Sequence, residues 1–171
     1  MEALRRIAKA GWLISVLIFF TSLFASYFYW PEIVEIYLIN SSGDFYGLER
    51  SYLFYIILFF FISFNLILLY IVPLLKKIPS EFLTWKNKEY WAKQGNYFNG
   101  ILINSLITFF IAINLLYSLS VLILTLHNME DPEFRKDIST FEWIKFLWLT
   151  VVIIWPLFLL LRINYKKKIV E

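Results

Sequence analysis

The chain contains no cysteine, only five glycines and few charged residues, which make up 17% of its 171 positions. Without cysteine there is no disulfide, no thiol nucleophile and no thiolate metal ligand. Apolar side chains account for 60% of the residues and aromatic side chains for 21%. Soluble domains are nearer half apolar and a quarter charged. The composition therefore excludes a disordered chain and argues strongly against an ordinary soluble domain.

Charge is also missing in long continuous stretches. No Asp, Glu, Lys or Arg occurs in residues 10–31, 51–75, 94–129 and 146–161. A helix that crosses a bilayer needs about 20 mostly apolar residues, and the long side chains that flank the shorter fourth stretch can reach back to the headgroups. We therefore predict an all-α membrane protein, a single domain over 1–171 that forms an antiparallel four-helix bundle. The predicted transmembrane helices are about 11–30, 52–75, 101–126 and 144–162.

Two other interpretations of these stretches are weaker. Strands of a membrane barrel alternate apolar with polar residues, whereas residues 51–75 are almost continuously apolar. The first stretch follows basic residues, as a signal peptide does, but it is longer than a typical signal core and ends in Tyr27-Phe28-Tyr29-Trp30 rather than at small residues. We expect an uncleaved first helix.

The basic residues predict the orientation. The amino-terminal segment, residues 76–100 and the carboxy-terminal segment hold 12 of the 16 Lys and Arg residues. Because loops rich in Lys and Arg stay in the cytoplasm, we expect both termini to be cytoplasmic. Because these basic residues lie beside the spans, we expect them to interact with anionic lipid, and we expect no nucleic-acid partner. The spacing of Trp12 and Trp30 predicts that they bracket the first span at the two membrane interfaces.

The third span has the most polar face. At about 100° per residue, five polar side chains fall within one arc and must meet a neighbouring helix or a wet cavity. They are a candidate helix-contact or ligand face: Asn104, Thr108, Asn114, Ser118 and Thr125. The first span carries a face of small residues: Gly11, Ser15, Ser22 and Ser26. We expect this face to pack against the third span, and self-association through it is the alternative. Asn65 in the second span is expected to bond to a neighbouring helix.

The connecting segments offer further candidates. Residues 33–39 are expected to form a short strand or helix, and residues 40–44 a turn. The inner loop mixes bases with aromatic residues and is a candidate partner or lipid-interface loop, represented by Trp85, Lys86, Lys88, Tyr90 and Trp91. His127 with Glu130 and Asp131 is a weak metal candidate, and we predict no metal or cofactor site. No catalytic motif and no mid-span charge is present, which argues against an enzyme and against a coupled transporter.

Two segments carry a family resemblance. Asn87-Lys88-Glu89-Tyr90-Trp91, after Pro79, resembles a cytoplasmic-loop motif of small bacterial membrane proteins that have a domain of unknown function. The same domain occurs in sporulation-delaying-toxin immunity proteins. Pro31 with Gly47-Leu48-Glu49-Arg50 is similar to the outer loop of that family, although Tyr37-Leu38 replaces its His-Phe pair, and Thr84 and Lys86 replace its Asn and Pro. The resemblance implies a bacterial plasma-membrane protein and assigns no functional residue.

Taken together, these observations predict a non-enzymatic protein of the bacterial inner membrane that acts as an interaction, sensing or immunity-like component. Its expected partners are the lipid bilayer and either another membrane protein or a second copy of the chain. The alternative is a passive pore or a small subunit of a transport complex, built by oligomerisation around the face that runs from Asn104 to Asn114.

Overall fold

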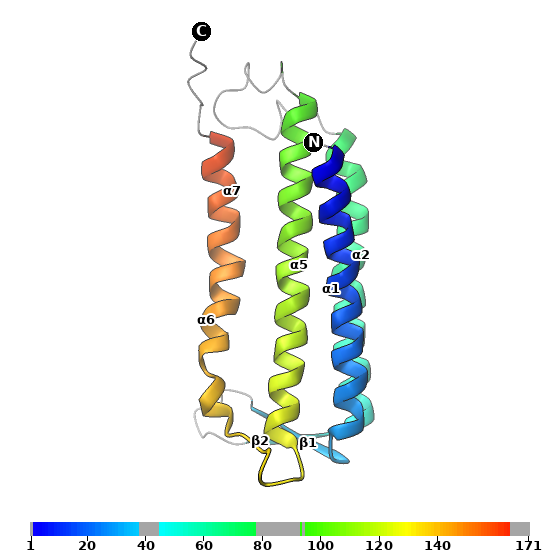
Figure 1. Ribbon diagram of the computed structural model, residues 1–171, viewed down its shortest axis with the longest axis vertical. Helices are drawn as coiled ribbons and strands as arrows, with labels where there is room; N and C mark the ends of the chain where they lie inside the picture. The colour runs from blue at the N-terminus through cyan, green and yellow to red at the C-terminus, as the bar shows by residue number, and fades with distance from the viewer. Residues whose placement is uncertain (1, 38–44, 78–92, 94, 165–171) are drawn as a thin grey trace.

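The computed structural model describes residues 2–37, 45–77, 93 and 95–164. Within them, helical spans stand side by side, and successive spans run in opposite directions (Figure 1). The spans are formed by α1 (Glu2–Tyr29), α2 (Arg50–Lys77), α5 (Gly95–Asn128) and a fourth span that comprises α6 (Trp143–Leu149), the π-helical turn η2 (Thr150–Ile154) and α7 (Trp155–Asn164). A short 3-10 helix, η1 (Ile138–Phe141), precedes the fourth span.

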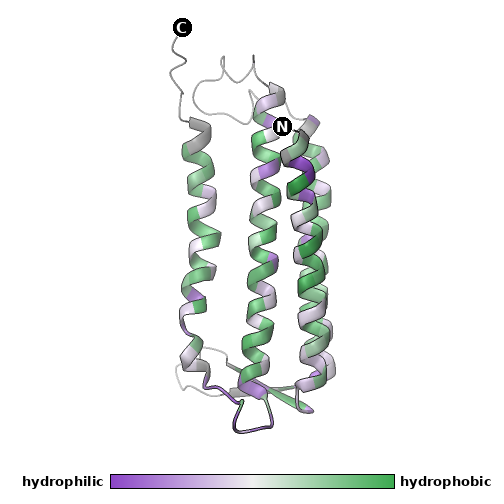
Figure 2. Cartoon of the chain, viewed as in Figure 1, coloured by the Kyte–Doolittle hydropathy of each residue, from purple (hydrophilic) through white to green (hydrophobic). Residues whose placement is uncertain are grey.

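All four spans are long and apolar enough to cross a membrane. Their candidate membrane segments are Arg5–Tyr29, Arg50–Leu75, Tyr97–Asn128 and Ser139–Leu161. Apolar residues cover the middle of the spans, and polar residues gather toward the ends (Figure 2). A mostly helical fold with four helices long and apolar enough to cross a membrane agrees with the predicted four spans. The helices extend beyond the predicted limits because their backbone hydrogen bonding continues past the apolar stretches, into turns that contain charged residues.

The connection between α1 and α2 contains a two-stranded antiparallel hairpin, which the all-α prediction did not include. Strand β1 (Ile33–Tyr37) pairs with β2 (Phe45–Glu49), with Ile33 opposite Glu49 and Tyr37 opposite Phe45. The sequence Ile-Val-Glu-Ile-Tyr is rich in β-branched residues, which favours a strand over a helix. Val34 is completely buried against the end of the bundle. The predicted turn at 40–44 lies outside the described residues.

The first helix packs most closely on α5, and the two run in the same direction. A Cβ added to Gly11 would lie 3.2 Å from Ile111 Cδ1, so the absence of a side chain allows this approach. Ser15 and Ser26 are buried on the same face of α1. The predicted packing of the small-residue face of the first span against the third is therefore confirmed.

Aromatic stacking joins α2 to the other helices of the core. The rings of Phe19 on α1 and Phe61 on α2 stack with centroids 3.5 Å apart, and both side chains are almost completely buried. One turn farther along α2, Phe64 stacks on Phe110 of α5 at 4.3 Å. Together, α1, α2 and α5 form a tightly packed three-helix unit.

The fourth span lies beside this unit and contributes no buried residue over its membrane segment. Near its outer end, the Trp148 indole N–H donates to the Ser120 hydroxyl at 3.0 Å. The Trp148 ring also meets the Tyr117 ring edge-on, with centroids 5.1 Å apart. The turn η2 precedes Pro156, which has no N–H and whose ring would clash with the carbonyl four residues earlier in a regular helix. A wider turn relieves this conflict.

Candidate functional site

A hydrogen-bonded network occupies the centre of the three-helix unit. The amides of Asn65 on α2 and Asn114 on α5 face each other. Asn65 Nδ2 donates to Asn114 Oδ1 at 3.0 Å, and Asn114 Nδ2 donates back to Asn65 Oδ1 at 3.1 Å. From α1, Ser15 Oγ accepts a bond from Asn114 Nδ2 at 3.1 Å, and Trp12 Nε1 donates to Asn65 Oδ1 at 2.9 Å. Three helices are therefore tied at one level of the bundle.

The network uses the hydrogen-bonding groups of both amides. Asn65 Nδ2 also donates to the Phe61 carbonyl at 3.0 Å, and the Ser15 hydroxyl donates to the Trp12 carbonyl at 2.7 Å. Asn114 is completely buried and Asn65 nearly so. In hydrocarbon an unpaired amide costs several kcal/mol, so complete pairing stabilises this packing. The network is structural and leaves no amide group available for a ligand.

The carboxy-terminal half of the same α5 face is also closed. The Thr125 hydroxyl accepts the Trp30 indole N–H at 2.9 Å and donates to the Val121 carbonyl. Ser118 is buried and donates to the Asn114 carbonyl at 2.9 Å. Trp30 directly follows α1 but is only 2% exposed, so its indole lies inside the bundle rather than toward lipid. Its buried indole needs a hydrogen-bond acceptor, and Thr125 supplies one.

At the carboxy-terminal end of α5, the β hairpin is attached to this helix. The Asn128 side chain accepts from the Glu35 backbone N–H at 2.7 Å and donates to the Glu35 carbonyl at 2.9 Å. The Glu35 carboxylate pairs with Arg135 at 2.9 Å and lies 3.7 Å from His127 Nε2. His127 Nδ1 is 3.1 Å from the Lys136 carbonyl. Because a carbonyl only accepts, this contact places a proton on Nδ1.

His127, which with Glu130 and Asp131 is the metal candidate of the sequence, makes structural contacts instead. His127 is buried between the hairpin and the loop that follows α5, and its neighbours there are Glu35 and Lys136. Glu130 and Asp131 are exposed. In the part of the chain that the structure describes, no group of three His, Cys, Asp or Glu side chains is arranged to hold a metal ion.

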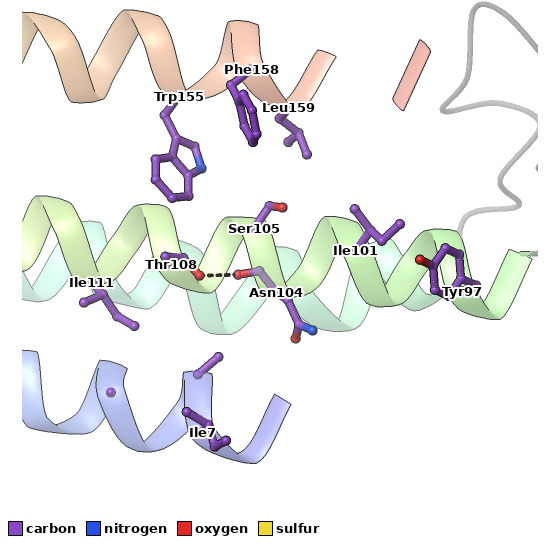
Figure 3. Close-up of a pocket in the computed structure, with 12 residues that line it drawn as sticks. Ile7, Tyr97, Ile101, Asn104, Ser105, Thr108, Ile111, Trp155, Phe158 and Leu159 are labelled. Carbon is purple, nitrogen blue, oxygen red and sulfur yellow. Dashed lines mark hydrogen bonds between the residues drawn. The ribbon is translucent and has the colours of Figure 1, made fainter. Parts of the chain in front are cut away.

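The amino-terminal half of the α5 face opens onto a cleft. A cavity of about 590 Å³ lies between the start of α1, the first half of α5 and α7. Asn104, Ser105 and Thr108 line it from α5, and Trp155 and Phe158 face them from α7 (Figure 3). The Thr108 hydroxyl donates to the Asn104 backbone carbonyl at 2.8 Å. Asn104 Oδ1 is buried without a hydrogen-bond partner, unlike the amide oxygen of Asn114.

The predicted polar face is thus divided. Asn114 and Thr125 bond to side chains outside α5, Ser118 is buried and bonds back within α5, and Asn104 and Thr108 line the cleft. The prediction that Asn65 bonds to a neighbouring helix is confirmed. The candidate loop residues lie outside the described residues: Trp85, Lys86, Lys88, Tyr90 and Trp91.

Several contributors were not found from the sequence. Glu35 and Asn128 are 93 positions apart, and no local pattern announces that a side-chain amide will pair with the edge of a hairpin strand. The sequence predicts that Trp12 lies at a membrane interface and does not indicate that its indole N–H bonds to Asn65.

Compared with family models, curated proteins and solved structures, the chain gives no match.

Proposed function

We propose that this chain is a non-enzymatic, multi-pass protein of the bacterial cytoplasmic membrane that acts as an interaction, sensing or immunity-like component. Both ends lie in the cytoplasm in this proposal, as the distribution of Lys and Arg favours. The resemblance of residues 79–91 to a family that includes immunity proteins supports the same role. The observation that carries the proposal is the contrast between the closed three-helix unit and the fourth span.

The amides of Asn65 and Asn114 satisfy each other within the three-helix unit, and the aromatic core of the unit is internal. The fourth span takes no part in that network, and its membrane segment contains no buried residue. The fourth span contacts α5 through Trp148, and its carboxy-terminal part, α7, borders the cleft. Moving or covering this span would leave the Asn65–Asn114 pair intact. Such an element suits exchange of contacts with a partner in the plane of the bilayer.

The polar residues give less support to a pore. A conducting path through an oligomer requires polar side chains at the surface where copies meet. Asn114 instead faces α1 and α2 and is 0% exposed. Its exposure to a pore would require breaking the network that joins three helices. Conduction by purified protein in liposomes, abolished by Asn114→Leu with the fold retained, would favour the pore over an interaction component.

Photo-crosslinking in native membranes tests the proposed function. Phe146 on the fourth span and Phe59 on α2 are apolar and 69% and 66% exposed, so they form a matched pair. We expect a benzoylphenylalanine at position 146 to give one protein adduct of defined mass, either another membrane protein or a second copy, and position 59 to give lipid adducts. Mass spectrometry identifies the partner, and a crosslinker placed on that partner should recover this chain.

The same measurement at positions 85 and 91 tests the inner loop as a second contact surface. Recovery of lipid alone at positions 146, 85 and 91, as at 59, would overturn the interaction proposal. A protein adduct of equal yield at 146 and 59 would also count against it, because both surfaces would then be reporting random collisions in the membrane.

A further inference from the structure

We propose that the cleft between α1, α5 and α7 binds one anionic phospholipid from the leaflet at the amino-terminal end of the bundle. This binding site is independent of the partner contacts proposed above. The proposal depends on the shape of the cleft, on its depth in the membrane and on one amide oxygen that the protein leaves unpaired.

The shape and lining suit an acyl chain. The cavity volume of about 590 Å³ corresponds to about twenty groups of water size, at about 30 Å³ each. A methylene group is of similar size, so one fatty acyl chain fits and a helix does not. The lining is largely apolar, with Ile7 and Ile111 on one side and Trp155 and Phe158 on the other (Figure 3). Because it lies within the membrane spans, lipid is the solvent that reaches it.

The depth of the cleft matches one leaflet. It follows α5 from Tyr97 to Ile111, a rise of about 20 Å at 1.5 Å per residue. A leaflet contributes about 15 Å of hydrocarbon plus its headgroup layer. Tyr97 would then lie at the water-facing edge of the headgroup layer, Asn104 about 10 Å deeper near the boundary with the hydrocarbon, and Ile111 about 10 Å farther in.

The register between α1 and α5 places positive charge at the headgroup level. Gly11 meets Ile111 and Ser15 bonds to Asn114, and the two helices run in the same direction. The level of Asn104 on α5 therefore corresponds to the first two turns of α1, which carry Arg5 and Arg6. Basic side chains beside a span attract anionic lipid by about 1 kcal/mol each. A phosphate at the mouth of the cleft would have these two cations close to it.

The Asn104 amide requires a hydrogen-bond donor from the molecule that occupies the cleft. Its Oδ1 atom is buried and has no hydrogen-bond partner. The hydroxyl of Thr108 is already committed to the Asn104 backbone carbonyl. Buried amide oxygens are normally paired. A hydroxyl of a glycerol headgroup, carried by the same lipid whose phosphate meets Arg5 and Arg6, would supply the missing donor. Phosphatidylglycerol has both groups, whereas phosphatidylcholine has a phosphate but no donor.

Native mass spectrometry tests the proposal. The full chain is reconstituted in vesicles of equal phosphatidylglycerol and phosphatidylcholine, and its retained lipid is counted. We expect one phosphatidylglycerol per chain. Ser105→Phe fills the cleft from α5 and should lower retention by about tenfold, equivalent to about 1.4 kcal/mol. Ala10→Phe adds the same ring to an exposed position of α1 outside the cleft and should retain the lipid.

Two further variants separate the polar contributions. Asn104→Leu keeps the shape of the side chain and should reduce the preference for phosphatidylglycerol by about fivefold, the value of one hydrogen bond. Replacing Arg5 and Arg6 by Gln should weaken retention, whereas Lys145→Gln, at the opposite end of the bundle, should not. If circular dichroism shows that Ser105→Phe does not fold, the lipid preference of Asn104→Leu, compared with that of the wild type, decides the test. Equal retention of both lipids in the wild type and in every variant would mean nonspecific surface lipid and would overturn the proposal.

Discussion

Asn65 and Asn114 form a reciprocal amide pair, with hydrogen bonds of 3.0 and 3.1 Å between α2 and α5. Trp12 and Ser15 extend the pair to α1. The pair fixes which faces of the three helices meet, because rotation of any one helix would leave an amide unpaired in hydrocarbon. In a membrane, apolar faces alone discriminate poorly between alternative helix arrangements. This one contact therefore makes the packing of the helices specific.

Asn114→Leu should destabilise the folded protein, because it removes both bonds between the Asn65 and Asn114 amides and the bond that Ser15 accepts, and leaves Asn65 only its contacts with Phe61 and Trp12. We expect a loss of about 2 kcal/mol, within the range for an unsatisfied buried polar group. The double variant Asn65→Leu/Asn114→Leu should recover part of this loss, since both amides are then replaced by apolar groups. Unfolding in mixed micelles with increasing dodecyl sulfate measures the free energies, and strictly additive losses would contradict the reciprocal pairing.

Gly11 should not tolerate a larger side chain. A Cβ at this position already lies 3.2 Å from Ile111 Cδ1, so Gly11→Val would push α1 away from α5. We expect a loss of about 1–3 kcal/mol from overpacking, and a small effect for Gly11→Ala, since the Ile111 side chain can shift. Ala10→Val is the control, because Ala10 is exposed. Equal stability of Gly11→Val and Ala10→Val in the same unfolding measurement would contradict the close approach of the two helices.

The number and approximate positions of the spans and the contact between α1 and α5 were predictable, because both follow from local patterns. Long charge-free stretches define spans whatever their neighbours are. The face of small residues that contains Gly11 and Ser15 favours close packing against a neighbouring helix. The division of the α5 face was not predictable, since Asn104 and Asn114 share one arc and differ only in what lies opposite. Likewise, the sequence of residues 33–37 allowed a strand but did not specify its pairing with α5 through Asn128.

At the outer end, Asn128 should hold the hairpin more firmly than the ion pair does. Asn128→Leu removes both hydrogen bonds to the Glu35 backbone. Arg135→Ala removes a pair whose side chains are 49% and 46% exposed, and such pairs contribute about 0.2–1 kcal/mol. Hydrogen exchange at the Glu35 amide should therefore accelerate much more in Asn128→Leu than in Arg135→Ala. The opposite order would show that the side-chain charges, rather than the backbone pairing, fasten the hairpin.

The carboxyl group of Asp137 should titrate below its ordinary range. Its Oδ1 atom accepts the Ser139 backbone N–H at 3.0 Å at the start of η1, and this bond, with the Ser139 side chain and nearby His127, lowers the Asp137 pKa. A lowered carboxyl pKa stabilises the folded loop above the unfolded pKa, and that contribution is lost as pH falls through the folded value. Carbon-13 NMR of the labelled carboxyl measures it. Ser139→Ala should raise the pKa only in part, because the backbone bond remains, and no change would contradict the side-chain contribution.

The proposed orientation predicts that both ends of the chain face the cytoplasm. The absence of cysteine makes single-cysteine variants unambiguous reporters. Ala3 and Glu133 are exposed and lie at opposite ends of the bundle. In intact bacterial cells, a membrane-impermeant maleimide should label Glu133→Cys and leave Ala3→Cys unlabelled until the membrane is permeabilised. Lys93→Cys, which follows the inner loop, should behave like Ala3→Cys. Labelling of Ala3→Cys in intact cells would reverse the orientation and place the lipid cleft in the outer leaflet, because the cleft lies at the same end as the first turns of α1.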